Sequence, residues 1–279
     1  MSETTEDNGQ PAKRGLQNRH VQLIAIGGTI GTGLFMGAGN SIHYAGPAIL
    51  LVYLTIGLFM FVMMRAVGEL LYADPTQHTF ITFITRYIGN RTGFFARWSY
   101  WLTIVFMGMA ELTAVAKYIQ YWLPGMPSWL IQIIMLVVLT SVNLVAVALY
   151  GETEFWFAMI KIVAILALIV TGIIMALTGF KTPVGDVAFS NVWQHLSLFP
   201  NGVGNFINAF QMVMFAFVGM EFIGMTTAET DNPRAVLPKA INQIPWRILF
   251  FYLGALFIIM TIYPWQKIPA DQSRSEEHT

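Results

Sequence analysis

The sequence contains no cysteine and few charged residues, and both absences limit what the protein can be. Of its 279 residues, none is Cys and only 11% are Asp, Glu, Lys or Arg. Without Cys there is no disulfide, no thiolate nucleophile and no Cys-based metal site. Soluble domains carry about 25% charged residues. This chain therefore cannot cover a water-facing surface with charge, which excludes soluble enzyme folds.

An excess of one charge and the usual cofactor motifs are also missing. Lys plus Arg and Asp plus Glu number 15 each, which leaves no basic surface for nucleic acid. The five His residues show no metal-ligand spacing, and there is no Gly-x-x-x-x-Gly-Lys motif. We therefore expect no metal, no cofactor, no nucleic-acid partner and no enzymatic or ATP-driven chemistry.

Apolar residues are what the chain has in abundance. They make up 56% of it, and the mean hydropathy is +0.60. A membrane-spanning helix needs about 20 such residues in a row. The first 20 residues are polar and predict a disordered tail, not a signal peptide. Seven apolar segments follow, and they predict an all-α, multi-pass membrane protein. These segments lie at about 21–43, 47–72, 97–122, 128–149, 155–178, 203–226 and 247–263.

The distribution of basic residues predicts the orientation, because Lys and Arg favour cytoplasmic loops. With the N-terminus inside, the inner side holds Lys13, Arg14, Arg19, Arg86, Arg91, Arg97, Arg234, Lys239 and Arg247. The outer loops and the final tail then hold only Lys181, Lys267 and Arg274. This bias predicts a cytoplasmic N-terminus. It argues against a seven-helix receptor, whose N-terminus lies outside.

The first apolar segment contains a glycine-rich interruption, GGTIGTG, at residues 27–33. A pair such as Gly27 and Gly31 can serve close helix packing, but four glycines in seven residues exceed that need. Glycine weakens a helix, and unwound backbone at membrane depth is tolerated where it is buried or lines a cavity. The helix after the break would point free N–H groups at the gap. An anionic group such as a substrate carboxylate would bind there, with the Thr32 hydroxyl as a further donor.

The sixth apolar segment offers a second interruption, FAFVGMEFIG at residues 215–224, in which two glycines flank Glu221. Segments one and six are the first of two five-span halves. Glycine-interrupted segments at corresponding positions of two halves indicate a transporter site built on inverted repeats.

Several long motifs resemble one family of transporters. They are NRHVQLIAIGGTIGTGLFMGAG (18–39), AGP (45–47), RAVGEL (65–70), EFWFAMIKIVAI (154–165) and FAFVGMEFIGMTTAETDNPRAVLPKAI (215–241). With them, the sequence from about residue 16 to about residue 266 resembles the amino acid/polyamine/organocation transporters. Within these it resembles the bacterial amino-acid permeases, above all the proton symporters for D-serine, D-alanine and glycine.

The resemblance implies a fold of two inverted five-helix repeats, of which this sequence holds about the first seven helices. Residues 1–20 would be the cytoplasmic tail, 21–178 the first repeat and 179–266 a partial second repeat with helices six and seven. Residues 267–279 would be an outer-loop remnant with an artefactual tail, because the final SRSEEHT is a polar run that resembles neither the next outer loop nor an anchor. The sequence is therefore expected to be truncated at its C-terminal end.

The resemblance also implies a substrate site at the two interruptions. Phe215 would be an aromatic gate over the bound amino acid. The carboxylate would be held by Gly31, Thr32 and Gly33, and the ammonium by the carbonyls of Thr29, Phe215 and Val218. The full set of implied substrate-binding residues is Thr29, Ile30, Gly31, Thr32, Gly33, Phe215, Val218 and Gly219.

Lys161 is a charged residue inside the fifth apolar segment. A charge at the bilayer centre costs at least about 2.5–3.5 kcal/mol on insertion scales, so something must compensate for it. One interpretation is that its long stem reaches the interface. The other, which the resemblance implies, is that its ammonium replaces a coupled ion beside the first interruption, and gains and loses a proton during the cycle. Burial favours the neutral amine, which makes the second interpretation workable.

Two carboxylates, Glu111 and Glu221, also lie within apolar segments. Glu111 is either a hydrogen-bonding partner of a neighbouring helix or a group for substrate selection or proton relay. Glu221 is expected mainly to hold the irregular backbone of the sixth segment together, by accepting from loose N–H groups, and a role in proton coupling or substrate selection is the alternative.

These observations predict a secondary active transporter of the bacterial plasma membrane. It would import a small neutral amino acid together with a proton by alternating access, and its partners would be that amino acid, the proton and the lipid bilayer. An amino-acid exchanger of the same fold is the alternative. A seven-helix receptor or sensor is disfavoured by the orientation and by the glycines within the spans.

Overall fold

The computed structural model describes residues 30–74, 77, 79–145, 150–183, 185–194, 197–222 and 233–268. Most of this part of the chain is helical. The α-helices are α2 (Thr32–Phe35), α3 (Gly37–Ala45), α4 (Ile49–Ala73), α5 (Phe80–Tyr87), α6 (Asn90–Trp122), α7 (Ser128–Val145), α8 (Tyr150–Thr178), α9 (Gly202–Ala216), α11 (Pro233–Asn242), α12 (Ile244–Arg247) and α13 (Gly254–Ile262). The other elements are the 3-10 turns η1 (Gly46–Ala48), η3 (Phe189–Val192) and η5 (Trp265–Lys267), the π-helix η4 (Ile248–Leu253), and the strands β1 (Lys181–Thr182) and β2 (Gly185–Asp186).

Four helical runs in the described part are long and apolar enough to cross a membrane. They are Gly37–Ala73, Asn90–Trp122, Phe155–Thr178 and Arg234–Ile262. These runs overlap the segments predicted at 47–72, 97–122, 155–178 and 247–263, and a shorter apolar helix over Ser128–Leu144 overlaps the one at 128–149. The segment predicted at 21–43 overlaps the shorter helices α2 and α3, and the segment predicted at 203–226 overlaps α9. The chain is a mostly helical, multi-pass membrane protein.

The connections are more ordered than the sequence predicted, and the chain is not purely helical. Strands β1 and β2 form an antiparallel hairpin in which Lys181 pairs with Asp186. The hairpin closes because the Thr182 hydroxyl donates to the Gly185 carbonyl at 2.8 Å, while Gly185 adopts a φ of 156°. The short helix α5 was not predicted either. It starts where the Thr79 hydroxyl accepts from the N–H of Ile81 at 3.4 Å, an N-cap contact.

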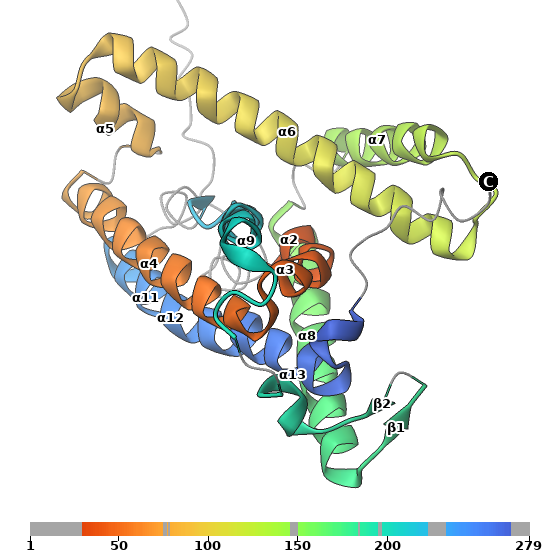
Figure 1. Cartoon of the computed structure of the whole chain (residues 1–279). Coiled ribbons are helices and arrows are strands. Elements are labelled where there is room, and N and C mark those ends of the chain that lie inside the picture. The colour runs from red at the N-terminus through yellow and green to blue at the C-terminus, as the bar shows by residue number, and fades with distance from the viewer. Residues whose placement is uncertain are drawn as a thin grey trace, which may run out of the picture.

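The core lies where α4 runs beside α11 and α12, with α9 packed against both α3 and α4, and with α8 along α13 (Figure 1). Small residues let these helices approach closely. A Cβ atom added to Gly57 of α4 would lie 2.9 Å from a side-chain atom of Ile248. Gly68 meets Ile241, and Gly172 of α8 meets Ile258, in the same way. Glycines therefore let isoleucine side chains of η4 and α11 pack closely on α4, and one of α13 pack closely on α8.

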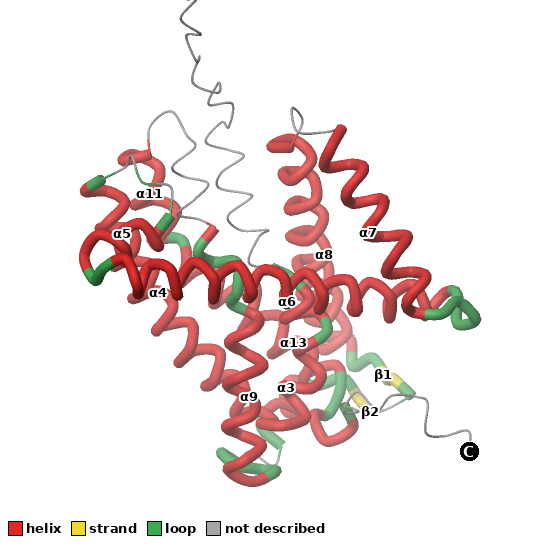
Figure 2. Tube along the Cα trace, turned by 90° about the horizontal axis from the view of Figure 1, so that it is seen from above, coloured by secondary structure: helices red, strands yellow, loops and turns green. Residues whose placement is uncertain are grey.

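Helix α6 runs across the other helices, with α5 at one end and α7 at the other (Figure 2). Its only fully buried residues in the described part are Gly93, Ala114 and Ala116. Large aromatic side chains, among them Trp98, Trp101 and Phe106, are more than half exposed along it. A helix so apolar on its exposed side suits contact with lipid.

Candidate functional site

The described part of the chain begins at Ile30, within the first predicted interruption, and Gly31 follows just before a short helix. Gly31 is extended (φ −132°, ψ −163°) and precedes α2, a helix of only four residues. A turn at Met36 separates α2 from α3. Ile30 is buried at 1% exposure, and Gly33 is also buried. Thr29, which was predicted to supply a carbonyl, lies outside the described residues. The predicted glycine-rich segment is therefore not one continuous helix.

The second interruption lies at the end of α9. This helix stops at Ala216, and residues 217–221 form turns in which Gly219 has a φ of 97°. One expectation needs correction here. The Phe215 carbonyl is not left open, because it accepts from the N–H of Val218 at 3.2 Å. The chain tightens into a turn at this point instead of unwinding fully. No described residue donates to the Val218 carbonyl, which leaves it as the candidate acceptor on this side.

The two interruptions touch each other. A Cβ atom built on Gly33 would lie 2.9 Å from both the Cβ and the backbone N of Ala216, and closer still to its Cα. Real Cβ atoms do not come so near. The start of α2 and the end of α9 are therefore packed backbone to backbone, although 183 positions separate Gly33 from Ala216 in the sequence. This contact places Gly31, Thr32 and Gly33 next to the turn that contains Val218 and Gly219.

Glu111 of α6 lies against the first interruption. The Thr32 hydroxyl donates a hydrogen bond to Glu111 Oε1 at 2.9 Å, and a Cβ atom on Gly31 would lie 3.4 Å from the same oxygen. This pairing corrects the expectation that the Thr32 hydroxyl is a free donor for a substrate carboxylate. While Glu111 is ionised it can only accept hydrogen bonds, so the Thr32 hydroxyl donates to it and not to a substrate. A carboxylate, a hydroxyl and the first amides of a helix thus meet at one point.

Glu221 fastens the second interruption. Its Oε2 accepts from the Gly219 N–H at 3.0 Å, and its Oε1 accepts from the Tyr100 hydroxyl of α6 at 3.4 Å. The expected role of Glu221 in holding irregular backbone agrees with these contacts. The sequence did not single out Tyr100, since a tyrosine in an aromatic-rich helix carries no signal of its own. Helix α6 therefore contacts both interruptions through carboxylate hydrogen bonds.

Replacement of Glu221 should separate its hydrogen bonds from its charge. Glu221→Gln keeps an oxygen that can accept from Gly219, so folding and uptake should change little. Glu221→Ala leaves the Gly219 N–H without that partner, and we expect the free energy of unfolding to fall by about 1–3 kcal/mol. Thermal unfolding of the detergent-solubilised protein, monitored by size exclusion, compares the stability of the two variants, and uptake into proteoliposomes compares their transport. A well-folded Glu221→Gln variant without uptake would contradict the structural role.

Lys161 lies on α8 and is half-buried. Its helix packs against α13, and the neighbouring Ala158, Ile162 and Ile165 are all buried. Lys161 therefore sits at the edge of the buried face. The glycine-rich backbone it was expected to reach, residues 27–29, lies outside the described residues. A role in place of a coupled ion stays a prediction.

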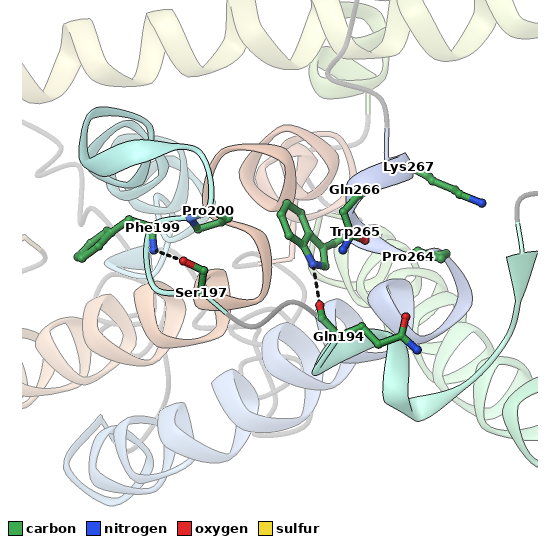
Figure 3. A pocket seen from close by; sticks show the side chains of 8 residues that line it. All are labelled: Gln194, Ser197, Phe199, Pro200, Pro264, Trp265, Gln266 and Lys267. Carbon is green, nitrogen blue, oxygen red and sulfur yellow. Dashed lines mark hydrogen bonds between the residues drawn. The ribbon is translucent and has the colours of Figure 1, made fainter.

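A hollow of about 730 Å³ lies elsewhere, where the connection before α9 meets the end of α13 (Figure 3). It is lined by Gln194, Ser197, Phe199, Pro200, Pro264, Trp265, Gln266 and Lys267. The Trp265 indole N–H donates to the Gln194 carbonyl at 3.3 Å. Helix α9 has 15 residues, which at 1.5 Å per residue gives a length of about 20 Å. This length separates the hollow at its start from the interruption at its end. The hollow is thus separate from the contact between the two interrupted segments.

Comparison with known proteins matches most of the sequence to amino acid permeases. The family model described as amino acid permease matches residues 20–276. The chain is 58% identical over 264 residues to a DL-alanine permease of Lactococcus lactis subsp. cremoris, and 56% identical over 270 residues to a serine permease of that organism. It is 46% identical over 265 residues to the D-serine/D-alanine/glycine transporter of Escherichia coli K12.

These alignments take in nearly all of the chain but little more than half of each relative. They cover 95%, 94% and 95% of the chain, and 57%, 59% and 56% of the three relatives in the same order. The chain thus spans about three fifths of the length of the curated relatives it matches.

Proposed function

Because this chain belongs to the amino acid permease family, whose members are transporters and not enzymes, we propose that it forms the substrate site of a proton-coupled symporter for a small neutral amino acid. D-serine, D-alanine, glycine and L-serine are the candidate substrates, since the names of its relatives include alanine, serine and glycine. The site lies in the bacterial plasma membrane, with the N-terminus cytoplasmic. Residues 21–178 form the first inverted repeat, and residues 179–266 form part of the second.

The observation that carries this proposal is the contact between the two interrupted segments beside Glu111. Gly33 touches Ala216, and Thr32 bonds to Glu111 at 2.9 Å. The N–H groups at the start of α2 would receive the substrate carboxylate. The Val218 carbonyl would accept from its ammonium, together with that of Thr29. Phe215, which is 37% exposed, would cover the bound amino acid as a gate.

The Thr32–Glu111 pair offers a way to link protonation to substrate binding. When Glu111 is ionised, the Thr32 hydroxyl proton points at it. When Glu111 binds a proton, its own O–H can donate to Thr32 Oγ1, and the Thr32 hydroxyl proton is released to donate to the substrate carboxylate. Proton and substrate would then favour each other's binding, as symport requires. Loss of the proton reverses both hydrogen bonds and weakens the hold on substrate.

Lys161 is proposed as the second titratable group, which discharges its proton during the return step. It is half-buried on α8, next to the buried Ala158 and Ile162, and so lies at the edge of the packed face of this span.

Uptake measured in proteoliposomes that contain the whole gene product tests the proposal. We expect accumulation of labelled alanine, serine or glycine when a proton gradient is imposed, and no added drive from sodium. Lys161→Met keeps an apolar stem but removes the amine, so accumulation should be lost while exchange with preloaded substrate continues. Sodium-driven uptake that ignores the proton gradient would contradict proton coupling. Exchange without net uptake by the unmodified protein would favour an exchanger.

A further inference from the structure

Tyr252 holds the end of α9 from a neighbouring span. Its hydroxyl donates to the carbonyl of Ala216 at 2.9 Å, and the side chain is buried at 1% exposure. Ala216 is the last residue of α9. The carbonyls of a last helical turn have no partner within their own helix, and at membrane depth water cannot replace one. The Tyr252 hydroxyl supplies that partner across 36 positions of sequence.

A π-helix brings Tyr252 to this place. Residues Ile248–Leu253 form η4 between two ordinary helical segments, α12 and α13. A π-turn holds an extra residue within the helix, which changes the direction of the side chains in it, and such turns are frequent at functional sites. The irregular turn of the seventh span thus meets the irregular turn of the sixth.

An aromatic cluster fixes the ring of Tyr252 as well as its hydroxyl. The ring stacks on that of Phe217, the first residue after α9, with centroids 4.9 Å apart and planes at 8°. Tyr53 of α4 completes the cluster, with its ring 6.0 Å from Phe217 and 5.7 Å from Tyr252. Phe217 and Tyr53 are both fully buried. Two tyrosines therefore share one environment, but they differ in their hydroxyl groups. The Tyr53 hydroxyl has no hydrogen-bond partner in the described part of the chain.

We propose that Tyr252 is a positioning residue for the substrate site, which acts through the Ala216 carbonyl and the Phe217 ring to set the turn at residues 217–220. This inference rests on the proposed function, because that turn carries the Val218 carbonyl assigned to the substrate ammonium. Ala216 is also the residue that Gly33 touches. The Tyr252 hydroxyl thus fixes the position of the end of α9 relative to both the turn after it and the start of α2.

The test compares Tyr252→Phe with Tyr53→Phe. Each variant loses one buried hydroxyl from the same cluster and keeps its ring, so the two should pack alike. Removal of the Tyr252 hydroxyl leaves a buried carbonyl without this donor, and the KM for the transported amino acid should rise about fivefold to tenfold. The maximal rate should change by less. Tyr53→Phe removes a hydroxyl that satisfies nothing in the described part, so its KM should match that of the unmodified protein.

A second readout does not depend on transport. Hydrogen–deuterium exchange of the whole protein in detergent should show faster exchange of the amides of residues 217–220 in Tyr252→Phe, and no change in Tyr53→Phe. Equal KM and equal exchange in the two variants would overturn the role of Tyr252. Failure of the unmodified protein to take up any amino acid would instead count against the proposed function, and the exchange data alone would then decide about Tyr252.

Discussion

Gly33→Ala is expected to lower amino-acid uptake by about tenfold to a hundredfold, because overpacking at a close contact costs about 1–3 kcal/mol. The added methyl would lie 2.9 Å from the Cβ and N of Ala216 and closer to its Cα. These neighbours include backbone atoms, and a backbone cannot swing aside as a flexible side chain can. The methyl must push α2 away from α9. The N–H groups at the start of α2 and the turn after α9 would then no longer face one substrate.

Gly37→Ala is the matched control for this variant. Gly37 opens α3, four positions further along, and a Cβ atom there meets no described atom within 4 Å. Alanine also favours a helix over glycine. This control should therefore fold and transport like the unmodified protein. Uptake by cells that express the whole gene product, normalised to the amount of protein in the membrane, compares the two variants. Equal uptake by both would show that the contact between α2 and α9 is not needed for transport.

The sequence alone indicated where irregular backbone lies, because glycine content is a local property. Four glycines at 27–33 and the pair around Glu221 predicted two interruptions, and the structure has a bend at Gly31 and turns after Ala216. The hydrogen bond from the Gly219 N–H to Glu221 could be expected from the same local reasoning, since N–H groups of irregular backbone need an acceptor. Hydropathy predicted the long spans for a similar reason.

The partners within the site could not be predicted, because they depend on contacts between distant residues. Thr32 and Glu111 are separated by 79 positions, and Tyr100 and Glu221 by 121. No pattern in the sequence links them. The Phe215 carbonyl was wrongly expected to be open, since the glycine count does not reveal whether a break unwinds or tightens into a turn. Tyr252 was missed because a single tyrosine in an apolar span has no periodic signal.

Helix α5 and the β1–β2 hairpin were missed because both lie in connections, where hydropathy is uninformative. Their signals are local hydrogen bonds of Thr79 and Thr182. Such threonine contacts are common in sequences that form no helix or strand, so they become evidence only when the backbone around them is known.

Glu111→Gln should separate substrate binding from its dependence on pH. Under the proposed coupling, substrate competes with Glu111 for the Thr32 hydroxyl proton until Glu111 takes up the transported proton, so the KM should be lower in acidic medium. A hydrogen bond to a charged group contributes about 1.5–3 kcal/mol, which corresponds to about a tenfold change in KM or more. The amide of Gln can donate to Thr32 Oγ1 at any pH, as protonated Glu111 would. The variant should therefore keep a low KM in both acidic and neutral medium.

The two Thr32 variants complete this experiment. Thr32→Ser keeps the hydroxyl, so the KM should still depend on pH. Thr32→Val keeps the shape of the side chain but can donate a hydrogen bond neither to Glu111 nor to the substrate. Its KM should be high, and the pH dependence should be weak. Initial uptake rates across substrate concentrations at each pH give all four KM series. A Glu111→Gln variant whose KM still depends on pH would contradict coupling through Thr32 and Glu111, because the proton that alters substrate affinity must then bind elsewhere. Lys161 would be the next group to examine.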